Sequence, residues 1–259
     1  MPILNAGYRY TIDQLKRILR TDPVLPIAHL EYRRDLTSDR SRVRLSQQEW
    51  LNLCHDSQLH IAMHHTTLTK GSRNPEKHFF ACASSKTAKL THWNMRQLSG
   101  MAGVRFCLGI HPNHWELTAL NRTNTPNQAI PDAIIHLEPR DLPIGKKKRS
   151  WYGGLTYLED IAVEWDSGSA VRTQLEFKVL AYKAVAQYQI WVAPTFARAE
   201  TLQDVCHSVL EDASIRIGIL VVDWRTGLCS GSSLPKRGTY LSKILETTMR
   251  EVHDKWYWS

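Results

Sequence analysis

The stretch Leu158-Glu-Asp-Ile-Ala-Val-Glu-Trp-Asp166 decides the fold of the second half of the chain. Alternate side chains of a β-strand point to opposite faces, which places four residues on one face: Asp160, Ala162, Glu164 and Asp166. The continuous apolar run Ile161-Ala162-Val163 is typical of a strand that is covered on both faces. The stretch therefore predicts a buried strand with a row of acidic side chains on one face.

The segment that follows this strand, Ser169–Gln187, predicts an amphipathic helix. Steps of three and four residues define a stripe of Val171, Leu175, Lys178, Tyr182 and Val185. Lys178 is the charged member of that stripe, so its ammonium must either extend to solvent or pair with a carboxylate. A helix packs against the strand that precedes it in a βαβ unit, so the nearest acids are Glu164 and Asp166. We expect Lys178 to pair with one of them.

Apolar runs alternate with helical stretches from about residue 104 onward, a pattern typical of an α/β sheet. The predicted strands are Val104–Ile110, Ala133–Leu137, Leu158–Asp166, Gln189–Ala193 and Ile215–Trp224. The predicted helices are Ser169–Gln187, Ala199–Ala213 and Tyr240–Trp256. Residues 101–259 are therefore expected to form an α/β domain, with a mixed sheet flanked by helices.

Residues 1–100 predict a separate and mainly helical domain. Thr11 is the predicted N-cap of a helix over Tyr10–Arg20, and Ser46 begins a second helix with a capping-box signature. The strand-like segment Lys77–Cys82 is a candidate wing. Short basic helices with a wing favour winged-helix-like DNA binding, and the alternative is a helical cap that packs on the second domain.

The net charge of +8 is concentrated in the first part of the chain. Residues 1–100 hold fifteen Lys and Arg against eight Asp and Glu, whereas residues 101–259 hold eighteen against seventeen. Such an excess favours a polyanion partner, although solubility alone is the simpler explanation. The candidate DNA-binding residues form an arginine run and a tetrabasic cluster, Arg33, Arg34, Arg40, Arg42 and Arg44 with Lys146, Lys147, Lys148 and Arg149.

The acidic residues predict a site for metal-dependent cleavage of a phosphodiester. Such chemistry uses carboxylates to hold Mg²⁺ and a cation to orient water or to stabilise charge on the phosphorus centre. Asp132 begins an apolar strand, and Glu164 and Asp166, about 7 Å apart along theirs, would gain from a shared cation. Lys178 is the candidate catalytic cation. A solvent-facing edge strand would explain the acids without any metal.

These residues resemble a known family. The order Pro131-Asp132, then Glu164-x-Asp166-Ser-Gly-Ser169, then Lys178 and Tyr182, then the strand Tyr188-Gln-Ile-Trp-Val192 looks like the replication-relaxation family of mobile-element proteins. The match covers about residues 111–195. The broader parent that it resembles is the PD-(D/E)XK nuclease superfamily.

The resemblance implies a restriction-endonuclease-like core preceded by a winged-helix domain, and a role in plasmid or transposon DNA processing. It implies that Asp132, Glu164 and Asp166 hold Mg²⁺ or Mn²⁺ and that Lys178 is a displaced catalytic cation. Asp166 stands where the superfamily's E-x-K motif has lysine. Three functions therefore stay open: a metal-dependent DNA endonuclease, a DNA-binding protein that no longer cuts, and an assembly subunit of a transposition or replication complex.

Other motifs exclude or weaken further classes of function. The chain has no G-x-S-x-G nucleophile elbow and no P-loop, which argues against a serine hydrolase and a nucleotide-binding protein. The segment His60–His65 has metal-ligand spacing on a helix but fits no zinc-finger pattern. Five cysteines without a C-x-x-C pair predict free thiols. With no apolar run long enough to span a membrane and no signal peptide, we expect a cytoplasmic protein.

Overall fold

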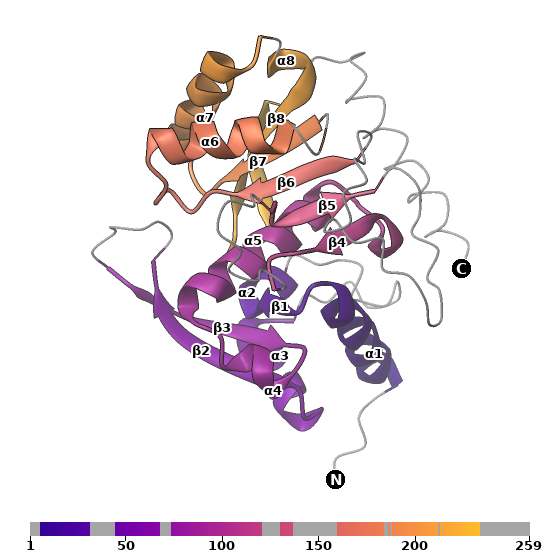
Figure 1. Ribbon diagram of the computed structural model, residues 1–259. Coiled ribbons are helices and arrows are strands. Elements are labelled where there is room, and N and C mark those ends of the chain that lie inside the picture. Colours follow the sequence, from indigo (N-terminus) through magenta and orange to yellow (C-terminus); the bar gives the residue numbers. More distant parts are fainter. Residues whose placement is uncertain are drawn as a thin grey trace. The chain divides into compact units, whose positions relative to one another are not determined.

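The computed structural model in Figure 1 describes residues 6–31, 45–67, 74–120, 130–136, 160–183, 186, 188–211 and 213–233. The chain divides into two compact units. The first unit comprises Met1–Cys107 and Val222–Ser230, and the second comprises Leu108–Val221 and Gly231–Ser259. Across the described ranges, none of the helices combines the length and the apolar character that a membrane crossing needs.

The first unit combines helices with a three-stranded antiparallel sheet of order β1-β3-β2. Its helices are α1 (Ala6–Thr21), α2 (Ile27–Leu30), α3 (Gln47–Asp56), α4 (Ser85–Ala88) and α5 (His92–Cys107). Its strands are β1 (Val24–Pro26), β2 (His60–Thr66) and β3 (Glu76–Cys82). The strand predicted at Lys77–Cys82 is confirmed. The helical spacing assigned to His60–His65 is wrong, because this segment is strand β2 and its successive side chains alternate between faces.

Helix α3 begins at the capping box that its sequence predicts. The Ser46 side chain accepts a hydrogen bond from the Glu49 backbone, and the Ser46 amide donates to Glu49 Oε2 at 2.7 Å. The N-cap prediction for Thr11 is wrong, because α1 begins at Ala6 and Thr11 lies within the helix. The predicted apolar face of α1, Leu15, Ile18 and Leu19, is buried, and Ile12 is buried with it.

The strand predicted at Val104–Ile110 is wrong, because Val104–Cys107 are the end of helix α5 and residues 108–110 are not in a strand. The buried side chains of α5 include Met95, Met101 and Val104, so the helix is covered over most of its circumference. A helix that is apolar on many sides lacks the single stripe that distinguishes it from a strand in sequence. Gly103 permits close packing here, since a Cβ at this position would lie 2.8 Å from the Val222 side chain.

The second unit is built on a mixed sheet. Its strands are β4 (Trp115–Leu117), β5 (Ala133–Ile135), β6 (Ile161–Trp165) and β7 (Tyr188–Ala193), and β8 (Ile217–Asp223) and β9 (Leu228–Ser233) extend across the division between the units. The sheet has six strands in the order β4-β5-β6-β7-β8-β9. Neighbours are antiparallel from β4 to β6 and parallel from β6 to β8.

The helices of the second unit are η2 (Pro112–His114), α6 (Arg172–Lys183), α7 (Phe196–Val209) and α8 (Ala213–Arg216). Helices α6 and α7 lie side by side on one face of the sheet (Figure 1). The core beneath them includes Ala162, Leu175, Val179, Trp191, Leu202 and Val205. A mixed α/β fold is thus confirmed, with four of the five predicted strands and both predicted helices that fall within the described residues. The helix predicted at Tyr240–Trp256 lies outside them.

Candidate active site

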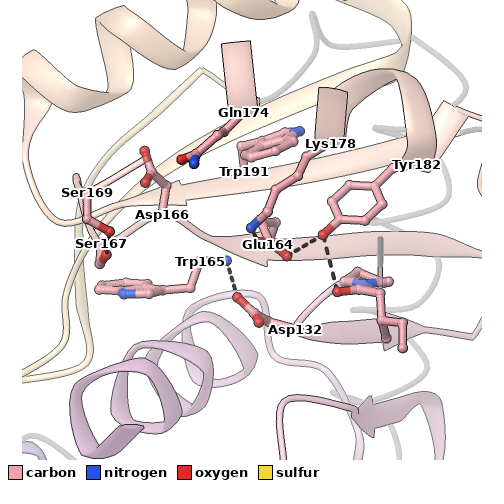
Figure 2. Close-up of polar contacts among 12 residues, drawn as sticks. Asp132, Glu164, Trp165, Asp166, Ser167, Ser169, Gln174, Lys178, Tyr182 and Trp191 are labelled. Atoms are coloured by element: carbon pink, nitrogen blue, oxygen red, sulfur yellow. Dashed lines mark hydrogen bonds and ion pairs between the residues drawn. The ribbon is translucent and has the colours of Figure 1, made fainter. Parts of the chain in front are cut away.

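Glu164 is the centre of a polar cluster at the carboxyl end of β6. Its side chain is buried, at 2% exposure, on the face of the sheet that packs against α6 and α7. Lys178 of α6 donates to Glu164 Oε1, and the Tyr182 hydroxyl donates to Oε2 at 2.7 Å (Figure 2). Both oxygens of this buried carboxylate are therefore held by donors from one helix.

Helix periodicity explains why Lys178 and Tyr182 reach the same carboxylate. They are four residues apart, so they lie one turn apart on the same face of α6. Leu175 and Tyr182 on this face are buried, whereas Val171, which precedes the helix, is 59% exposed and does not belong to the buried stripe. The Lys178 side chain is 33% exposed, so it pairs with Glu164 while its flank stays accessible to solvent. The pairing expected from the sequence is present.

Tyr182 also links this cluster to the segment that precedes β5. Its hydroxyl lies 3.2 Å from the backbone carbonyl of Ile130 and 2.7 Å from Glu164 Oε2. A phenol has one proton to donate, and the shorter contact with the charged acceptor is the stronger one. Tyr182 therefore acts mainly as a donor to Glu164.

Asp132 immediately precedes β5, the strand that pairs with the strand of Glu164. It is fully buried, and its Oδ2 accepts a 2.8 Å hydrogen bond from the backbone amide of Trp165, the residue after Glu164 (Figure 2). The antiparallel pairing of Ala133 with Val163 sets this register, because it places Asp132 opposite Glu164. Asp132 is thus bound to the backbone of β6 at the residue that follows Glu164.

Asp166 has a different set of partners, although strand alternation gives it the same face as Glu164. Its Oδ2 forms an ion pair with Nε of Arg198 from α7, and its Oδ1 accepts a 3.1 Å hydrogen bond from the Gly168 amide. Arg198 also donates to the Ala170 carbonyl at 2.7 Å. Asp166 and Arg198 therefore tie the turn between β6 and α6 to the first turn of α7.

The predicted metal site can be tested against these contacts. Over the part of the chain that the structure describes, no group of three or more His, Cys, Asp or Glu side chains is arranged to hold a metal ion. Asp132 and Glu164 are hard oxygen donors on adjacent strands, and this donor set suits Mg²⁺ or Mn²⁺. Each of the three carboxylates already has protein partners: Lys178 and Tyr182 for Glu164, the Trp165 amide for Asp132, and Arg198 and the Gly168 amide for Asp166. Binding of a metal ion by these carboxylates stays a prediction.

Sequence reasoning missed the role of Arg198. A cation in the first turn of a helix is unfavourable to the helix dipole, and this signal could have marked Arg198 as a residue with a specific partner. Thr195 is the N-cap of α7, so Arg198 lies in the first turn of the helix, whereas the predicted helix began at Ala199. Its partner Asp166 does not follow from the sequence, because it depends on how two helices pack.

A second polar cluster joins β4, β5 and β6. His136 contacts Asp160 Oδ2 through Nδ1 at 2.8 Å and Glu116 Oε2 through Nε2 at 3.1 Å. Carboxylates only accept hydrogen bonds, so both contacts are hydrogen bonds when both ring nitrogens carry protons. His114 binds the backbone of His136 at 2.8 Å and belongs to this cluster. Asp160, the first acid of the predicted row, therefore serves this cluster.

The nine candidate DNA-binding residues, Arg33 to Arg44 and Lys146 to Arg149, lie outside the described residues. Among the described cations of the first unit, Lys16, Arg17 and Arg20 form an exposed basic face on α1. Comparison of the chain with protein-family models, with curated protein sequences and with solved structures found no significant match.

Proposed function

We propose that this chain is a DNA-binding protein whose second unit has a restriction-endonuclease-like core, and that it hydrolyses phosphodiester bonds of DNA. The observation that supports the proposal best is the contact of Lys178 with Glu164 beside Asp132. It places an ammonium group on the buried carboxylate of Glu164, and Asp132 binds the backbone of the next residue; phosphodiester hydrolysis with a metal uses carboxylates together with a cation.

The mixed sheet supports the proposal that the second unit has a restriction-endonuclease-like core. Asp132 immediately precedes β5, and Glu164 lies near the end of the antiparallel neighbour β6, so the Pro131-Asp132 and Glu164-x-Asp166 motifs are adjacent. Helix α6 then connects β6 to the parallel strand β7. In the first unit, the hairpin of β2 and β3 beside helices α1 to α3 supports a winged-helix-like DNA-binding domain.

The proposed roles follow from burial and charge. Asp132 and Glu164 would hold the metal, which when bound supplies a Lewis acid and lowers the pKa of bound water. Lys178 is the most exposed of these three side chains, so it would be the first to contact a phosphate oxygen. Tyr182 would keep the Glu164 carboxylate oriented when Lys178 turns to the phosphate.

The basic residues favour DNA as the polyanion. Each Lys or Arg that contacts a phosphate releases condensed counterions and makes binding dependent on salt. The exposed face of α1 adds Lys16, Arg17 and Arg20 to the arginine run and the tetrabasic cluster. With the resemblance to mobile-element proteins, we propose that the reaction serves plasmid or transposon DNA processing.

Asp166 favours a second candidate function. It stands where the motif would have its lysine, and Arg198 holds it in an ion pair. Because the charge of Arg198 is used to neutralise Asp166, the site has one fewer cation for the phosphate. The alternative is therefore a nuclease-like DNA-binding or assembly subunit that does not cut.

A plasmid assay distinguishes the two functions. Supercoiled plasmid is incubated with Mg²⁺ or Mn²⁺ and the wild type, Lys178→Ala or Lys183→Ala; Lys183 is an exposed cation on the same helix and serves as the matched control. The endonuclease function predicts nicking by the wild type and Lys183→Ala and a large loss with Lys178→Ala. Salt-dependent DNA binding without nicking by any of the three would support the alternative. Absence of both binding and nicking would contradict the proposal.

A further inference from the structure

The end of α5 packs closely against the turn between β8 and β9, within the first unit. A Cβ placed on Gly103 would lie 3.1 Å from Gly227 Cα, and the Cys107 thiol donates to the Gly227 carbonyl at 3.0 Å. Gly103 and Cys107 are one turn apart, so the same face of α5 contacts Gly227 twice. This contact fixes the position of Cys107 against the turn.

Cys229 lies two residues beyond Gly227, on strand β9. The side chain of Cys229 is hydrogen-bonded to Cys107, and its backbone contacts the same thiol. The two sulfur atoms are therefore neighbours even though the residues are far apart in sequence.

We propose that Cys107 and Cys229 are a reversible dithiol that a small disulfide, such as oxidised glutathione, converts to a disulfide bond. The five cysteines all lie within the described ranges, and Cys229 alone among them is exposed. Cys107 is partly buried, whereas Cys54, Cys82 and Cys206 are buried and none of these three is described as contacting another thiol. In this pair an oxidant can reach the exposed thiol of Cys229, and the thiol of Cys107 lies next to it.

The order of the two steps follows from exposure and acidity. The hydrogen bond to Cys229, together with burial, raises the pKa of the Cys107 thiol above its usual range. The Cys229 thiolate therefore attacks a sulfur of the small disulfide first, which forms a mixed disulfide and releases one small thiol. Cys107 then loses its proton and attacks Cys229 Sγ, which forms the protein disulfide and releases the second small thiol. The protein loses two hydrogen atoms, and the oxidant gains them.

Oxidised glutathione is the probe for a direct test on the full chain. The wild type is oxidised, digested without reduction and analysed by mass spectrometry, and dithiothreitol is used to reverse the reaction. We expect a cross-linked peptide pair containing Cys107 and Cys229 that reduction separates. In Cys107→Ser, the second step has no nucleophile, so glutathione should stay attached to Cys229.

Two further variants provide the controls. Cys206→Ser removes a buried thiol of the other unit and should form the same cross-link as the wild type. Cys229→Ser removes the exposed thiol and should take up little glutathione. Stable attachment of glutathione to Cys229 in the wild type, or cross-links only between two copies of the chain, would overturn the proposal. Because the wild type alone gives the deciding cross-link, a variant that failed to fold would not obscure the result.

Discussion

The Tyr182 hydroxyl donates a 2.7 Å hydrogen bond to Glu164 Oε2, one helical turn beyond the lysine that contacts the other oxygen. Glu164 is 2% exposed, so these two donors replace the hydrogen bonds that water would make to its carboxylate. In the low-dielectric interior of a protein, burial of a carboxylate without partners costs roughly several kcal/mol. The contact therefore couples the stability of the second unit to the geometry of its candidate site.

Replacement of Tyr182 by phenylalanine tests that coupling. Tyr182→Phe keeps the buried ring and removes the donor to Glu164, a hydrogen bond to a charged acceptor worth about 1.5 to 3 kcal/mol. We expect the free energy of unfolding, measured with urea, to fall by about 2 kcal/mol. A change within the error of the wild-type value would show that the hydroxyl does not hold the carboxylate.

Replacement of Lys178 by methionine tests the ion pair. Lys178→Met keeps much of the aliphatic stem and leaves Glu164 with one donor. Loss of one partner of a fully buried pair costs about 3 to 5 kcal/mol, and the partial exposure of Lys178 lowers the expectation to about 2 kcal/mol. The double variant with Glu164→Gln should recover part of the loss, because it also removes the unpaired charge. If the double variant lost the sum of the free energies of unfolding that the two single variants lose, direct pairing would be contradicted.

Replacement of Asp166 by asparagine separates structural from chemical roles. Asp166→Asn keeps a carbonyl oxygen for the Gly168 amide and removes the charge that faces Arg198. We expect a loss of stability of about 2 to 3 kcal/mol and, if wild type cuts DNA, retention of cleavage. The exposed pair of Arg172 and Glu176 is the control, where Glu176→Gln should cost less than about 1 kcal/mol. Loss of cleavage at full stability would place Asp166 in the metal site.

Local rules explain which part of the site the sequence predicted. Strand alternation placed Glu164 and Asp166 on one face, and helix periodicity placed Lys178 toward that face, so their proximity needed no knowledge of the rest of the fold. The contact of Asp166 with Arg198 joins residues 32 positions apart on different elements. It depends on how α7 packs beside α6, which no local pattern encodes.

The fold shows the same difference between elements that a local pattern predicts and elements that no local pattern predicts. Strands β5 to β8 are mainly apolar runs, and they were predictable. The three-residue strands β1 and β4 contain Pro26 and Glu116, so neither has the continuous apolar run that marks β5. Helix α5 was predicted in part as a strand because most of its sides are buried. Burial on all sides removes the periodic signal that sequence reasoning uses.

Histidine burial predicts that acid weakens the first unit. Burial lowers the pKa of His78, Arg225 lowers it further, and Glu76 and Asp223 oppose that shift. Burial is also the main cause that lowers the pKa of His64. The unfolded chain therefore takes up protons as the pH falls through about 6.5, before the folded chain does, so stability should decrease through this range.

Urea unfolding between about pH 7 and pH 5 checks this expectation. His78→Gln should reduce the dependence of stability on pH relative to the wild type. His55→Gln is the control, because the His55 side chain is 87% exposed and should leave the dependence unchanged. Equal slopes for the wild type and His78→Gln would contradict the assignment.

Thiol acidity predicts which cysteines react in the folded protein. Burial raises the pKa of Cys54, Cys82 and Cys206 to about 12, so these three thiols should resist a maleimide at neutral pH. The exposed Cys229 should be labelled first. Intact mass should show rapid labelling at Cys229 in buffer and labelling of all five cysteines in urea. Rapid labelling of Cys206 in the folded chain would contradict its buried position.

The rate of nicking of supercoiled plasmid by the wild type and by Glu164→Gln, with Mn²⁺, tests the central claim most directly. Glutamine keeps the shape of the side chain and an acceptor for Tyr182, and it removes the charge that pairs with Lys178. We predict metal-dependent nicking by the wild type. The rate of nicking should decrease by about 100-fold or more in Glu164→Gln, and by a similar factor in Asp132→Asn. Nicking at equal rates by the wild type and Glu164→Gln, or no nicking by the wild type, would contradict a catalytic site centred on Glu164.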